Sequence, residues 1–92
     1  MELLTREATK KKITPLLITL QANSETPKEH SERGVEKFFF VIEGEVKIKI
    51  DKEEYLLKPN ETVYFDASLS HQIFNEKQKP ARILAAVSPS KI

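Results

Sequence analysis

Residues 36–50, EKFFFVIEGEVKIKI, decide the fold of this chain of 92 residues. In their second half, Val46, Ile48 and Ile50 alternate with polar residues, a period of two that predicts a strand with one buried face. Their first half contains an unbroken apolar run at 38–42, which predicts a strand covered on both faces. Gly44 lies between the halves and favours a tight turn or bulge, because glycine adopts positive φ without steric cost.

The remainder of the chain repeats this alternation of short strands and turns. Further strands are predicted at 15–21, 54–58, 62–65, 71–75 and 81–87, with a short edge strand at 3–5. The polar segment 22–34 is predicted to be a loop, and Pro59 with Asn60 has the composition of a turn. Outside residues 2–12, no window has a sustained helical period. The sequence therefore predicts one all-β domain, residues 1–92, built as a sandwich or barrel.

The composition excludes several classes of protein. There is no cysteine, so disulfides and thiolate metal sites are excluded. The net charge of +1 argues against direct nucleic-acid contact, which normally requires a basic surface. No apolar stretch approaches the roughly 20 residues of a membrane helix, and the N-terminus lacks a signal-peptide pattern. We therefore expect a cytoplasmic globular protein with no membrane partner.

The only two histidines, His30 and His71, are the first candidates for chemistry. Glu32 is two residues from His30, so an extended backbone would direct both side chains the same way. Two imidazoles and a carboxylate converging inside a barrel would suit a divalent metal. The spacing alone leaves a second interpretation open, in which both histidines are hydrogen-bonded structural residues.

Residues 36–90 resemble the cupin family, which has two conserved motifs. In the second motif, this chain has His71 and Asn75 in common with the family and different residues at three further positions. The five matched positions are Asn60, Asp66, Ser68, His71 and Asn75. Counting back from Gly44, the end of the first motif, places the family's metal ligands at His30, Glu32 and Lys37. The resemblance implies a double-stranded β-helix, or jelly-roll barrel, with a pocket lined by His30, Glu32, Lys37, His71 and Asn75.

Lys37 decides what this pocket can hold, because the family has a glutamate there. A charged ammonium repels a dication and offers no lone pair to it. We therefore predict no cofactor, with Lys37 paired to Glu32 where the family's metal would lie. The alternative is a residual site for zinc, nickel, manganese or iron on His30, Glu32 and His71.

Two functions follow from the resemblance. The segments 2–5 and 13–17 are similar to the start of the cupin domain that follows a helix-turn-helix in XRE-type transcription regulators. This similarity implies a sensor of a small ligand, either as a domain of such a regulator or as a free-standing relative. The alternative is a small metal-dependent enzyme of the isomerase or dioxygenase type, and a structural barrel without a ligand also remains open. Lys37 beside two histidines favours an anionic ligand. The apolar run at 38–42 favours a homodimer, because a chain this short has only one core to fill.

Overall fold

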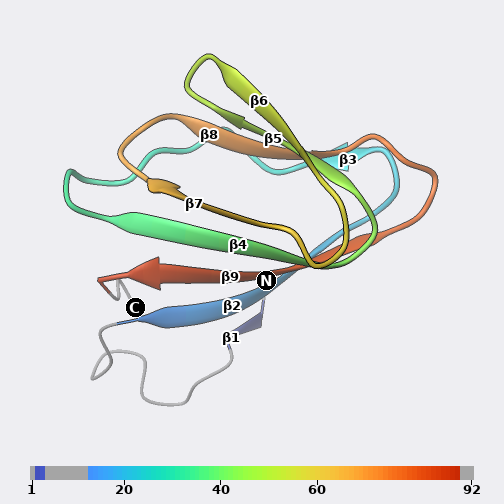
Figure 1. Cartoon of the computed structure of the whole chain (residues 1–92), viewed down its shortest axis with the longest axis horizontal. Helices are drawn as coiled ribbons and strands as arrows, with labels where there is room; N and C mark the ends of the chain where they lie inside the picture. Colours follow the sequence, from blue (N-terminus) through green and yellow to red (C-terminus); the bar gives the residue numbers. More distant parts are fainter. Residues whose placement is uncertain (1, 4–12, 90–92) are drawn as a thin grey trace.

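The strands form two antiparallel sheets that face each other, as Figure 1 shows. The computed structural model describes residues 2–3 and 13–89. The first sheet has the strand order β1-β2-β9-β4-β7. Its strands are β1 (Glu2–Leu3), β2 (Thr14–Leu20), β4 (Glu36–Glu43), β7 (Thr62–Asp66) and β9 (Ala81–Ser88).

The second sheet lies above the first in Figure 1 and has the order β3-β8-β5-β6. Its strands are β3 (Ser24–Glu25), β5 (Val46–Ile50), β6 (Glu53–Leu57) and β8 (His71–Asn75). No helix occurs among the described residues, and hence none long and apolar enough to cross a membrane. The all-β prediction is therefore confirmed. The predicted edge strand at 3–5 begins one residue earlier, and its last two residues lie outside the described part.

Alternating side chains of the two sheets meet to form the core. Val46, Ile48 and Ile50 all point inward from β5, as their period of two predicts. They pack against the inward residues of the first sheet, among them Val41 and Ile83, which are fully buried. The core fills the half of the barrel that contains the end of β4 and the start of β9.

The apolar run at 38–42 is covered on only one face within a single chain. Phe39 and Val41 are buried in the core, whereas Phe38 and Phe40 are half-buried and Ile42 is exposed. The prediction of a strand covered on both faces is therefore wrong for the isolated chain. The outer face of β4 therefore carries apolar side chains that are only partly covered by the described chain.

Two turns depend on residues with positive φ. Gly44 has a φ of 83° between β4 and β5, and a Cβ placed there would lie 2.9 Å from Cα and Cβ of Ala81. No other residue type fits this position without a shift of the backbone. Asn60 has a φ of 72° between β6 and β7, a conformation that asparagine tolerates better than most residues.

The polar segment 22–34 contains a strand that the sequence does not predict. β3 pairs with β8, and Thr26 continues this pairing through a hydrogen bond from its amide to the carbonyl oxygen of Ile73. Continuing the same register would place Lys28 opposite His71, but Glu29 occupies that position. The segment therefore contains one extra residue, a bulge that determines which side chains face the inside of the barrel.

A ligand pocket built on Lys37 and His71

A cavity of about 240 Å³ opens between the sheets, at the end of the barrel where β4 and β8 begin and β9 ends. Its walls are mostly apolar, and its polar groups gather at one side. The lining residues are Leu16, Ile18, Thr26, Pro27, Glu29, Lys37, Phe39, His71, Ile73, Ala85 and Val87. For comparison, an apolar cavity of about 150 Å³ is large enough for benzene. The site can therefore take a small molecule with an apolar body and one polar end.

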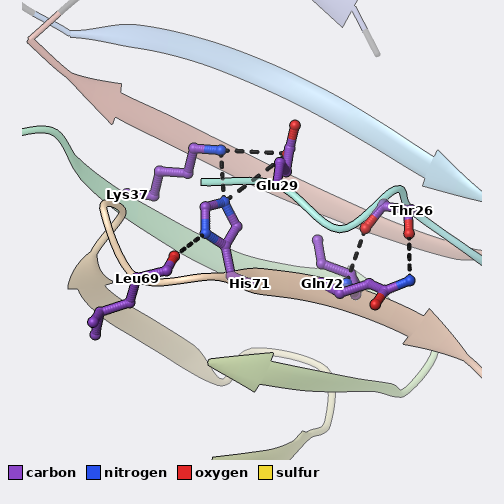
Figure 2. A network of polar contacts seen from close by, with 7 residues as sticks. Thr26, Glu29, Lys37, Leu69, His71 and Gln72 are labelled. Atoms are coloured by element: carbon purple, nitrogen blue, oxygen red, sulfur yellow. Dashed lines mark hydrogen bonds and ion pairs between the residues drawn. The ribbon is translucent and has the colours of Figure 1, made fainter. Parts of the chain in front are cut away.

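Three side chains form the polar end of this cavity (Figure 2). The ammonium group of Lys37 donates a hydrogen bond of 2.9 Å to Nε2 of His71. It also lies 3.4 Å from Oε1 of Glu29, whose carboxylate is 4.0 Å from Nε2 of His71. The side chains of His71 and Lys37 are only 2% and 13% exposed, whereas that of Glu29 is 53% exposed. Glu29 therefore lies at the mouth, and the two basic groups lie within.

The backbone fixes the tautomer of His71. Nδ1 lies 2.8 Å from the carbonyl oxygen of Leu69, which can only accept, so Nδ1 carries the hydrogen. Nε2 of the neutral ring then has a lone pair, which accepts the hydrogen bond from Lys37. Burial lowers the pKa of His71 below its ordinary value, and the charge of Lys37 lowers it further, against the opposing effect of Leu69. The ring is therefore neutral at pH 7.

A short turn before β8 positions the Leu69 carbonyl. Oδ1 of Asp66 accepts hydrogen bonds from both the backbone amide and the hydroxyl of Ser68, at 2.9 and 2.8 Å. These bonds lower the pKa of the Asp66 carboxyl, so the turn is held by a charged group. Asp66 and Ser68 are two of the positions at which this chain departs from the cupin motif, and they supply a different turn chemistry there.

The cavity contains Glu29 where the sequence predicts His30 and Glu32. The backbones of Glu29 and His71 exchange two hydrogen bonds of 3.0 and 2.9 Å, so their side chains share one face. His30 is the next residue, and its side chain is exposed, as is that of Glu32. Neither residue lines the cavity. The expected ion pair between Lys37 and Glu32 is corrected to one between Lys37 and Glu29.

Asn75 has a structural position instead of the predicted place in the pocket. Its side chain is buried at the opposite end of the barrel. The carboxamide nitrogen donates to the carbonyl oxygens of Leu20, Gln21 and Lys79, and the carboxamide oxygen accepts from the amide of Lys77. All its polar atoms are thus used to join the end of β2 to the β8–β9 connection. Asn75 closes the barrel and does not contact the cavity.

The residues at the polar end do not fit the divalent metal that the resemblance implies. The lone pair of His71 Nε2, the atom that would ligate it, accepts a hydrogen bond from an ammonium only 2.9 Å away. Among the residues that the structure describes, no three His, Asp or Glu side chains lie close enough together to hold a metal ion. His30, Glu32 and His71 are accordingly not assembled as the predicted trio.

Comparison with known proteins agrees with this architecture. The cupin domain family matches residues 16–87. TcmJ, a tetracenomycin polyketide synthase protein of Streptomyces glaucescens, is 29% identical over 68 residues, which cover 74% of this chain and 46% of that protein. The chain thus aligns with less than half of this relative.

Solved structures give the same result. The cupin domain of an XRE family transcriptional regulator from Enterobacter cloacae is 25% identical with a TM-score of 0.87, covering 95% of this chain and 92% of that one. A predicted oxalate decarboxylase from Thermotoga maritima is 20% identical with a TM-score of 0.83, covering 96% and 76% of the two chains, and it supports the fold alone. The family match, over most of the length, and these structures show that the chain belongs to the cupin family.

Proposed function

We propose that this cupin domain binds a small anionic molecule, with the anion beside the ammonium of Lys37 and the apolar part among the barrel residues. The supporting observation is the division of the cavity into an apolar wall and one polar end that carries a buried ammonium. Lys37 offers N–H donors to an oxygen anion, and burial strengthens such a charge-assisted hydrogen bond. The apolar walls add affinity in proportion to the ligand surface removed from water.

Benzoate is a suitable probe, because its ring matches the apolar part of the cavity and its carboxylate matches the polar end. Heteronuclear NMR titration should show benzoate shifting the amides around Lys37 and His71, and benzyl alcohol and benzylamine should bind more weakly. Lys37→Met should abolish the preference for benzoate. Lys47→Met is the matched control, since Lys47 also pairs with carboxylates but lies outside the cavity. Equal binding of the three probes by the unmodified protein would refute the proposal.

We further propose that this binding serves sensing, without a metal cofactor. The similarity to the cupin domain of an XRE family regulator supports a role beside a helix-turn-helix, in which this domain itself contacts no nucleic acid and works in the cytoplasm. The ammonium of Lys37 at the position of a metal ligand supports a metal-free site. The gene region upstream provides the test of sensing: a helix-turn-helix encoded in the same reading frame supports it, and its absence there contradicts it.

The outer face of β4 and β9 supports a homodimer as the working form. Its centre is apolar, formed by Phe38, Phe40 and Leu84. Charges of both signs lie at its margin, where Glu43 and Arg82 are opposite each other in the sheet. When two copies meet through this face about a two-fold axis, their apolar centres contact each other and the acidic groups of one copy face the basic groups of the other. We therefore propose a second copy of this chain as its partner.

A further inference from the structure

One oxygen of Glu29 occupies the place that a ligand oxygen would take. Oε1 of this carboxylate is 3.4 Å from Nζ of Lys37 and 4.0 Å from Nε2 of His71. Both distances are long for a charge-assisted hydrogen bond, which is usually about 2.7–2.9 Å. The carboxylate therefore faces both basic groups of the polar end without binding either of them tightly.

The backbone of Glu29 is fixed although its side chain is free to turn. Two backbone hydrogen bonds join Glu29 to His71, and Thr26 is joined to Ile73 by one through its amide and another through its hydroxyl. About half of the Glu29 side chain is in contact with solvent, so rotation about its own bonds moves the carboxylate into water. Because this ion pair is long and its carboxylate is half-exposed, it contributes little, and a competing anion can displace it without any movement of the loop.

We infer that Glu29 is an internal competitor that determines the specificity of the pocket, admitting carboxylate monoanions and disfavouring dianions. This inference rests on the proposed function and adds the rule by which the pocket selects between anions of different charge. A monocarboxylate that replaces Oε1 beside Lys37 brings the local charge to about −1, counting Lys37, the ligand and the displaced Glu29. A dianion such as a phosphate monoester adds a charge that the displaced Glu29, held nearby by its backbone, repels.

Glu25 offers a matched control on the same segment. It is an exposed carboxylate four residues earlier, and it accepts a hydrogen bond of 2.7 Å from the carboxamide of Gln72. It does not line the cavity. Glu25→Gln therefore changes the net charge by the same amount as Glu29→Gln and leaves the polar end intact, which separates the local effect from that of overall charge.

The test is calorimetry with benzoate and phenyl phosphate on the unmodified protein, Glu29→Gln and Glu25→Gln. Glu29→Gln should bind benzoate about fivefold more tightly, the upper range of what an exposed ion pair contributes, and should lose most of its discrimination against phenyl phosphate. Glu25→Gln should resemble the unmodified protein. Glu29→Ser serves as a second variant, and circular dichroism checks that each variant is folded.

Two results would overturn the inference. In the first, Glu29→Gln and Glu29→Ser bind benzoate no more tightly than the unmodified protein, while Lys37→Met still abolishes the preference for benzoate over benzyl alcohol and benzylamine. Glu29 is then not a competitor, and the proposed function stands. If benzoate binds none of the folded proteins, the proposed function fails and the inference fails with it.

Discussion

Nζ of Lys37 lies 2.9 Å from Nε2 of His71, so the ammonium of one residue donates to the lone pair of the other inside a largely apolar cavity. This contact requires a neutral imidazole, and the bond from Nδ1 to the Leu69 carbonyl places the single ring hydrogen on Nδ1 and leaves Nε2 as the acceptor. A proton on Nε2 would remove the acceptor and place two cations side by side. The protonation of His71 is therefore coupled to the integrity of the polar end.

The first prediction concerns stability and pH. The pKa of His71 is lowered in the folded protein, mainly by burial, so the unfolded chain binds a proton at higher pH than the folded one. The free energy of unfolding should therefore fall as the pH drops through about 6.5, the ordinary histidine value, until the pH is below the folded pKa. Urea denaturation between pH 7.5 and pH 5 measures this. His71→Gln should remove the decline and His30→Gln should retain it; an equal decline in all three proteins would contradict the assignment.

The second prediction concerns metal binding. Lys37→Glu replaces an ammonium by a carboxylate next to Nε2 of His71 and near Glu29, which removes the repulsion and adds a ligand. Affinity for zinc, nickel or manganese should rise about tenfold or more in calorimetry, a change expected when a repulsive charge leaves the ligand shell. Lys47→Glu is the control for the change in net charge. One tightly bound metal per chain in the purified unmodified protein would show that Lys37 does not exclude it.

The third prediction concerns the homodimer. Ile42 is 40% exposed on the outer face of β4, so Ile42→Glu should leave the fold of one chain intact and place a charge in the proposed contact. Light scattering should show a dimer for the unmodified protein and a monomer for this variant. Leu56→Glu, on an exposed residue of the other sheet, should remain dimeric. A monomeric unmodified protein would exclude the interface.

The fourth prediction separates backbone strain from crowding at two glycines. Both have positive φ, 93° at Gly34 and 83° at Gly44, but only Gly44 has neighbours that a Cβ would meet. Gly34→Ala should lower the free energy of unfolding by about 1 kcal/mol, the cost of a left-handed residue. Gly44→Ala should lower it by about 3 kcal/mol, since overpacking against Ala81 adds about 2 kcal/mol. Urea denaturation measures both, and equal losses would show that the contact with Ala81 relaxes freely.

Strand periodicity made most of the fold predictable. β5 and β8 have the predicted bounds, because an alternating apolar pattern specifies both the strand and its inward face. The resemblance to the cupin motifs, not this alternation, pointed to Lys37 and His71 as pocket residues, and both line the cavity. The two-residue strand β3 was missed because Ser24 and Glu25 have no apolar pattern and are held by pairing with β8 alone.

The bulge explains why Glu29 lines the cavity, whereas two of the five predicted pocket residues, His30 and Glu32, do not. A single residue added between Thr26 and Glu29 reverses which side chains face inward, and nothing in the local composition marks its position. Counting back from Gly44 along the cupin motif points to His30 and Glu32 and does not reach this bulge, whereas the pairing of Glu29 with His71 turns Glu29 to the cavity. Asn75 is identical to the motif residue, but the sequence does not reveal that its carboxamide is hydrogen-bonded to backbone groups at the closed end of the barrel.

The closure of the barrel by Asn75 also bears on how fast the proposed ligand can bind and leave. Because buried side chains fill that end, the proposed ligand would enter and leave by the mouth at which Glu29 lies. That route passes Pro27 and Glu29, on a segment tied to β8 at Thr26 and again at Glu29. Entry and exit therefore share the mouth beside the Glu29 side chain, so a substitution of this residue would change the association and dissociation rates together.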